Sequence, residues 1–175
     1  KHLRYGGKVF GISGGLQLLG EGLDDPSGSE GASASCAALG LLPITTSVNP
    51  EQELRDVQGS LNLSTDNSGI SAEFTGYIMH SIAIHSAEPL PPLTSINGQH
   101  EGVISADNQI AGTAVHGIFD QPAACDALLH WAGLQDLGAA VNYQAHRLEQ
   151  LDRLADQVED YLDTDWLRSV LKLDN

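Results

Sequence analysis

The strongest constraint on the fold lies near the start of the chain, in residues 8–20 (KVFGISGGLQLLG). An apolar run at residues 9–12 predicts a buried strand, and residues 16–19 predict the beginning of a helix. One polar side chain, Ser13, stands between them, among the glycines Gly11, Gly14 and Gly15. This pattern is typical of a nucleophile elbow, G-x-S-x-G, in which a sharp turn between strand and helix exposes a hydroxyl or thiol group.

Two properties of the turn follow from its residues. We expect the glycines to remove Cβ atoms that would clash in so sharp a turn. We expect the helix behind Ser13 to present free backbone N–H groups, and the positive end of its dipole, to a developing anion. An elbow strand in an open α/β sheet normally follows earlier strands, yet only residues 1–7 precede the segment 8–20 here. We therefore expect the chain to be a fragment of a longer one.

Composition limits the classes of function. The 175 residues are 41% hydrophobic, include 19 glycines and fit one domain over residues 1–175. A net charge of -15 argues against binding to nucleic acid or to anionic membranes, and no apolar run is long enough to span a bilayer. Cys36 and Cys125 form no C-x-x-C pair and suggest no disulfide framework, so a cytoplasmic location is expected.

Strands and helices are expected to alternate along the rest of the chain. A loop is predicted at residues 22–35 and a polar break at residues 64–71, because both segments are rich in turn-forming residues. The residue patterns predict strands at 44–48, 54–63 and 72–80, the last with an extension to 84. They also predict a hairpin of 101–105 with 110–115, and helices from 122, over 146–162 and over 166–173.

A serine nucleophile needs a base within hydrogen-bond reach, and the seven histidines are the candidates. His116 is the first choice because it ends a predicted strand and precedes a glycine, at the sheet edge where ligands bind in α/β folds. His80 also follows a strand and is the second choice. His130 lies in a predicted helix, whereas His2 and His146 are expected to face solvent.

Other chemistries lack their sequence patterns. The chain has no G-x-x-x-x-G-K-[ST] loop for phosphate and no zinc-ligand spacing such as H-E-x-x-H. The glycines around Ser13 also lack the third glycine of the dinucleotide fingerprint at its required offset. No metal and no cofactor are therefore expected in this domain.

Five segments, in order along the chain, resemble the class I glutamine amidotransferase domain of the cobyric acid synthase family. The elbow looks like that family's G-I-C-G-G-[FY]-Q-M-L-G, and three further segments look like its G-L-G-L-L-P, G-Y-E-I-H and G-T-Y-L-H-G-L-F-D; a last one fits its closing helix. The segments are residues 5–20 (YGGKVFGISGGLQLLG), 39–43 (LGLLP), 76–80 (GYIMH), 112–120 (GTAVHGIFD) and 151–156 (LDRLAD).

The resemblance implies a flavodoxin-like α/β fold, a three-layer sandwich without its first strand, and glutaminase activity. Glutamine would be the substrate, and the released ammonia would pass to an N-terminal synthetase domain that uses ATP and Mg²⁺ to amidate adenosylcobyrinic acid a,c-diamide. The family's nucleophile falls on Ser13 and its base on His116. Gly11, Gly14, Gln17 and His80 are the implied oxyanion and substrate-binding positions.

Three departures from the family bear on activity. Ser13 stands where the family has a cysteine, and a hydroxyl needs full general-base help where a thiol does not. The segment that completes the family's oxyanion hole would precede Lys1, and a half-built hole raises the barrier by roughly 3 kcal/mol. Ile78 replaces the glutamate of G-Y-E-I-H, and Ile118 stands where many related glutaminases carry a glutamate two residues after the base. We therefore expect little or no glutaminase activity.

Two alternatives remain open from the sequence. A serine hydrolase would use Ser13 and His116, with Asp107 or Asp120 to orient the base, and the order Ser–Asp–His favours Asp107. A non-catalytic docking or regulatory domain would keep a glutamine pocket without turnover.

Overall fold

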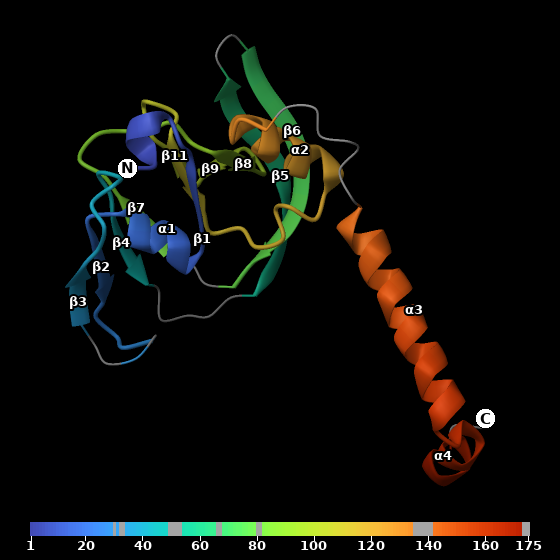
Figure 1. Ribbon diagram of the computed structural model, residues 1–175. Helices are drawn as coiled ribbons and strands as arrows, with labels where there is room; N and C mark the ends of the chain where they lie inside the picture. Colours follow the sequence, from blue (N-terminus) through green and yellow to red (C-terminus); the bar gives the residue numbers. More distant parts are fainter. Residues whose placement is uncertain are drawn as a thin grey trace. The chain divides into compact units, whose positions relative to one another are not determined.

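The computed structural model describes residues 1–29, 31, 34–48, 54–65, 68–79, 82–134 and 142–172 (Figure 1). The chain divides into two compact units, Lys1–Ala140 and Val141–Asn175. The first unit contains all the strands and the second contains two helices. The elements of the first unit are η1 (Leu3–Tyr5), β1 (Val9–Ile12), α1 (Gly14–Leu19), β2 (Gly22–Asp25), β3 (Ala34–Ala37), β4 (Thr45–Val48), β5 (Arg55–Thr65), β6 (Ser68–Ile78), β7 (Ile82–His85), β8 (Thr94–Ile96), β9 (Gln99–Glu101), β10 (Val103–Ile104), β11 (Ile110–Thr113) and α2 (Pro122–Trp131).

The elbow strand β1 belongs to a sheet of order β1-β11-β10. β1 runs parallel to β11, with Val9 opposite Ile110 and Ile12 opposite Thr113. β10 pairs antiparallel with β11, which confirms the predicted hairpin. The carboxyl ends of β1 and β11 therefore lie side by side, and the residues that follow them share one edge of the sheet.

Two further four-stranded sheets complete the first unit. One has the order β3-β2-β4-β7 and the other has the order β6-β5-β8-β9. β5 and β6 form a long antiparallel ribbon, drawn in green in Figure 1, with Arg55 opposite Ile78 and Thr65 opposite Ser68. The mixed α/β class predicted from the sequence is confirmed.

Two hydrophobic clusters hold these elements together. The smaller one packs Leu16 and Leu19 of α1 against Ile110 and its neighbours, which fixes the elbow helix on the first sheet. The larger one joins the β5–β6 ribbon to the helix α2, with Phe74, Val115, Ile118 and Trp131 all buried. Both Val115 and Ile118 flank His116, so the segment that carries this histidine is set in the core.

Several expectations need correction. The predicted loop at residues 22–35 contains β2 and the first residues of β3, because Gly22–Asp25 pairs with β3 and β4. The predicted break at residues 64–71 is mostly strand, since β5 continues to Thr65 and β6 begins at Ser68. The strand expected to reach Ile84 ends at Ile78, and β7 belongs to a different sheet.

The second unit contains α3 (Tyr143–Tyr161) and α4 (Thr164–Leu171), close to the predicted bounds. Each helix has an N-cap whose side-chain oxygen accepts a backbone N–H: Asn142 from Ala145 and Asp163 from Trp166. Residue 173, the predicted end of the last helix, lies outside the described residues. Among the helices of the described part, none is both long and apolar enough to cross a bilayer.

Candidate active site

Ser13 adopts the strained conformation that a nucleophile elbow requires. Its φ of 54° and ψ of -115° lie outside the regions that L-residues ordinarily occupy. Its backbone N–H donates to the Thr113 carbonyl oxygen at 2.8 Å, and its own carbonyl accepts from Gln17 N–H at 3.2 Å. The Ser13 hydroxyl does not cap the helix that follows. The backbone is thus fixed by β11 and α1, while the side chain keeps its hydroxyl for another partner.

The glycines of the elbow have different roles. A Cβ on Gly11 would lie 2.7 Å from the Gly15 carbonyl carbon and from Leu19 Cδ1, so only glycine lets α1 pack this closely on β1. The prediction that a Cβ would clash in the turn is confirmed for Gly11 but wrong for Gly14 and Gly15. A Cβ on Gly14 would meet only Gln17 Oε1, at 3.8 Å, and one on Gly15 would meet nothing within 4 Å. The chain reverses direction at Ser13 itself, so a side chain at Gly14 or Gly15 would not clash with the turn.

The predicted oxyanion and substrate positions lie around this turn. Gly14 is the first residue of α1 and is exposed, and the Gln17 amide reaches back beside it. Gly11 lies inside β1, where it is buried, so its part in the site is to allow the close packing of the helix. The binding roles of Gly14 and Gln17 remain predictions. His80 lies outside the described residues.

His116 follows β11 and is held by Tyr77 from β6. The backbones of these two residues bond in both directions: Tyr77 N–H donates to His116 O at 3.0 Å, and His116 N–H donates to Tyr77 O at 2.8 Å. The two rings stack, with centroids 5.1 Å apart and planes 10° apart. Nε2 of His116 is buried and has no hydrogen-bond partner in the described part of the chain. A buried imidazole nitrogen without a protein partner is free to exchange a proton with a bound molecule.

Ser13 and His116 thus share one edge of the first sheet. Thr113 connects them: its carbonyl accepts from Ser13 N–H, and His116 follows three residues later. Within the described residues no hydrogen bond joins the Ser13 hydroxyl to the His116 ring. Such bonds are often long without substrate, so the pair fits a nucleophile and base at rest.

The structure argues against the acids considered as orienters of the base. Asp107 lies in the turn before β11, at the opposite end of that strand from His116. There it accepts from the Ser105 hydroxyl, which lowers the pKa of the Asp107 carboxyl, and from Gln109 N–H. The Asp120 carboxylate lies over Gly117, and no hydrogen bond joins it to His116 in the described structure. Ile118 is fully buried in the core.

Three other histidines, His2, His130 and His146, lie away from this edge. His2, His130 and His146 are exposed, and His2 Nε2 lies 2.9 Å from the Lys8 carbonyl oxygen in the N-terminal turn. The solvent-facing predictions for His2 and His146 are confirmed. In the described ranges no group of three or more His, Cys, Asp or Glu residues is arranged to hold a metal ion.

Glu101 lies close to this edge of the sheet, although it is not among the site residues that the sequence predicts. Its carboxylate accepts from Ala114 N–H at 2.7 Å, from the Thr113 hydroxyl at 2.5 Å and from the Thr94 hydroxyl at 2.9 Å. These donors are 7 to 13 residues away in the chain and belong to β8 and to the end of β11. No local pattern joins them, so a single sequence carries no signal for this cluster.

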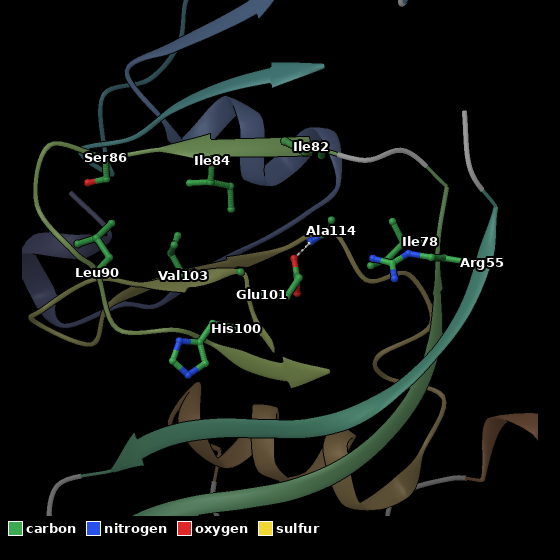
Figure 2. Close-up of a pocket in the computed structure, with 11 residues that line it drawn as sticks. Arg55, Ile78, Ile82, Ile84, Ser86, Leu90, His100, Glu101, Val103 and Ala114 are labelled. Carbon is green, nitrogen blue, oxygen red and sulfur yellow. Dashed lines mark hydrogen bonds between the residues drawn. The ribbon is translucent and has the colours of Figure 1, made fainter. Parts of the chain in front are cut away.

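A pocket of about 400 Å³ lies beside this cluster. Figure 2 shows Ile78, Ile82, Ile84, Leu90 and Val103 on its walls, with Arg55, His100 and Glu101 as its ionisable side chains. The dashed line in the figure is the bond from Ala114 N–H to Glu101. Three donors of the chain already bond to the Glu101 carboxylate, so this group stabilises the surrounding structure and does not serve mainly to bind a ligand in the pocket.

These features define a class of protein: a mixed α/β domain with a serine in a strained turn between strand and helix, and a histidine just after the neighbouring parallel strand. Comparison with known families agrees. The model of the CobB/CobQ-like glutamine amidotransferase domain matches residues 1–124 of the chain, which therefore belongs to this family. The flavodoxin-like α/β fold expected from the resemblance is confirmed, and the function of the chain is tied to glutamine.

Proposed function

We propose that the chain is the glutaminase domain of a cobyric acid synthase, impaired by a serine at the nucleophile position. The observation that carries the proposal is that a strained Ser13 and the buried, unpartnered Nε2 of His116 follow two neighbouring parallel strands. The family match over residues 1–124 supports glutamine as the substrate.

The reaction follows from these two groups. The residue at position 13 attacks the side-chain amide carbon of glutamine while His116 Nε2 takes its proton, and the carbonyl oxygen becomes an oxyanion. His116 then gives the proton to the departing NH₂ group as the C–N bond breaks, so ammonia leaves and a glutamyl-enzyme remains. Water, deprotonated by His116, hydrolyses that ester or thioester and releases glutamate. The N–H groups at the start of α1, Gly14 first, face the developing negative charge.

Serine weakens the first of these steps. A thiol is a few per cent thiolate at neutral pH, whereas a hydroxyl must lose its proton during the attack. His116 has no carboxylate partner in the described structure that would orient it and stabilise its charged form. The site therefore suits a cysteine nucleophile better than a serine.

Ammonia needs an acceptor, and we place that step in a separate synthetase domain that binds ATP and Mg²⁺ and amidates adenosylcobyrinic acid a,c-diamide. This chain then needs no cofactor of its own. A cytoplasmic location fits such a biosynthetic role.

The test compares the natural chain with Ser13→Cys, measuring glutamate release and labelling by 6-diazo-5-oxo-L-norleucine, a diazo-ketone analogue of glutamine. We expect Ser13→Cys to raise both by at least about 100-fold, the usual scale of a general-base contribution. Adding His116→Asn should abolish the gain, while His146→Asn, at an exposed helical site, should leave it unchanged. A natural chain that hydrolyses glutamine as fast as Ser13→Cys would overturn the proposed impairment.

A fluorophosphonate probe separates the two alternative functions. Rapid covalent labelling of Ser13 in the natural chain would favour a serine hydrolase over an impaired glutaminase. Glutamine binding measured by calorimetry, without turnover in either variant, would favour a docking or regulatory domain.

A further inference from the structure

Glu101 joins two parts of the molecule that are distant in sequence. It ends β9 in the sheet of order β6-β5-β8-β9, but two of its three donors lie at the end of β11 in the elbow sheet. The next residue, Gly102, allows this approach: its φ is +65°, and a Cβ there would lie 2.5 Å from the Gly112 carbonyl oxygen. The close approach at Gly102 therefore places the Glu101 carboxylate against the backbone at the end of β11.

Glu101 contacts the segment that lies between Ser13 and His116 in the structure, at Thr113 and Ala114. Thr113 faces Ser13 through its carbonyl and faces Glu101 through its hydroxyl. The same hydroxyl oxygen accepts from Val115 N–H at 3.1 Å, so its single hydrogen is left for Glu101. Ala114 N–H, beyond the last paired residue of β11, donates to the other carboxylate oxygen. Glu101 thus bonds residues 113 and 114 directly, and it holds the Thr113 hydroxyl that accepts from Val115 N–H, just before His116.

A carboxylate suits this position better than its amide isostere. All three partners are donors, and an ionised carboxylate only accepts. A glutamine would place its NH₂ group against either Ala114 N–H or the two threonine hydroxyls, so at least one of these buried donors would lose its acceptor.

We propose that Glu101 is a positioning residue for His116, fixing residues 113–115 so that the imidazole is held at the sheet edge beside Ser13. It acts through the backbone and the Thr113 hydroxyl of the segment that leads to His116. The catalytic consequence rests on the proposed glutaminase function, whereas the effect on the His116 ring does not.

The first experiment uses the natural chain and needs no activity. The ring resonances of His116 are assigned by their loss in His116→Asn and followed by NMR in Glu101→Gln and Thr113→Val. We expect both variants to move or broaden the His116 signals. Ser105→Ala is the matched control: Ser105 accepts from Gln109 and Ile110 N–H at the opposite end of β11, so its loss should leave these signals in place.

The second experiment measures glutaminase kinetics in the Ser13→Cys background. We expect Glu101→Gln to lower kcat about 10- to 100-fold, the scale of a misplaced catalytic group, with KM within about twofold. Thr113→Val should act in the same direction, and the double variant should lose less than the product of the two effects. Ser105→Ala should leave kcat unchanged, even if this variant unfolds at a lower urea concentration than the Ser13→Cys chain.

The outcomes separate the two proposals. Unchanged His116 signals in folded Glu101→Gln would overturn the positioning role, as would an equal loss of kcat in Ser105→Ala. If Glu101→Gln does not fold, Thr113→Val decides by the same readouts. If Ser13→Cys releases no glutamate while Glu101→Gln still moves the His116 signals, the glutaminase proposal fails and the positioning role stands.

Discussion

Tyr77 and His116 are bonded through their backbones in both directions and stacked through their rings, 5.1 Å between centroids and 10° between planes. This pairing links the long β5–β6 ribbon to the segment that carries His116. The ring of His116 therefore has one face covered by an aromatic side chain, while its Nε2 is buried without a hydrogen-bond partner in the described residues. The stack and the backbone bonds together orient the imidazole ring.

Removing the Tyr77 ring should loosen His116. In the Ser13→Cys background we expect Tyr77→Ala to lower kcat about tenfold or more, because the contact between the rings is worth about 1 kcal/mol and also fixes χ angles of the base. Tyr77→Phe keeps the ring and should keep most of the activity. Glutamate release measures both variants. Equal activity in Tyr77→Ala and Tyr77→Phe would show that the stack has no part in orientation.

Gly76 permits the close approach of β6 to His116. A Cβ at this position would lie 2.3 Å from the His116 carbonyl oxygen and 2.7 Å from Val115 Cγ1, so one of the segments must move. We expect Gly76→Ala to lower the free energy of unfolding by about 1–3 kcal/mol and to shift the His116 NMR signals.

Gly69, in the same strand, is the matched control for that substitution. A Cβ there would meet nothing within 4 Å, so Gly69→Ala should be neutral or slightly stabilising. Urea unfolding of the two variants gives the comparison. A Gly76→Ala chain as stable as Gly69→Ala would contradict the close contact.

The sequence predicts features that depend on residues close together in the chain. It does not predict contacts between residues far apart in the chain. The elbow around Ser13 and the β10–β11 hairpin depend on neighbouring residues, and the sequence predicts both. The β8–β9 hairpin, which is not among the predicted elements, also has a local cause: Asn97 and Gly98, with φ of 51° and 77°, form a two-residue turn between Ile96 and Gln99. The stack on His116 and the bonds of Glu101 join distant strands, and only the fold brings them together.

Strain at Ser13 should be measurable as lost stability. Its φ of 54° with ψ of -115° suits glycine, so we expect Ser13→Gly to raise the free energy of unfolding by about 1–3 kcal/mol. Ser71→Gly, at an exposed position of β6, should lower it by roughly 0.5–1 kcal/mol, because glycine loses more entropy in a strand. Urea unfolding measures both. A Ser13→Gly chain that unfolds at a lower urea concentration than the natural chain would contradict the strained elbow.

The two thiols should react at very different rates. Cys36 lies on the exposed edge strand β3, whereas Cys125 is half-buried in the first turn of α2. Burial raises the pKa of the Cys125 thiol, and the negative charge of Asp126 adds to the shift, so less thiolate is present at any given pH. With Ellman's reagent at pH about 8 we expect one fast equivalent from Cys36 and a second that is at least about tenfold slower. Cys36→Ser should leave only the slow phase, and urea should make it fast; a fast reaction of folded Cys36→Ser would place Cys125 at the surface instead.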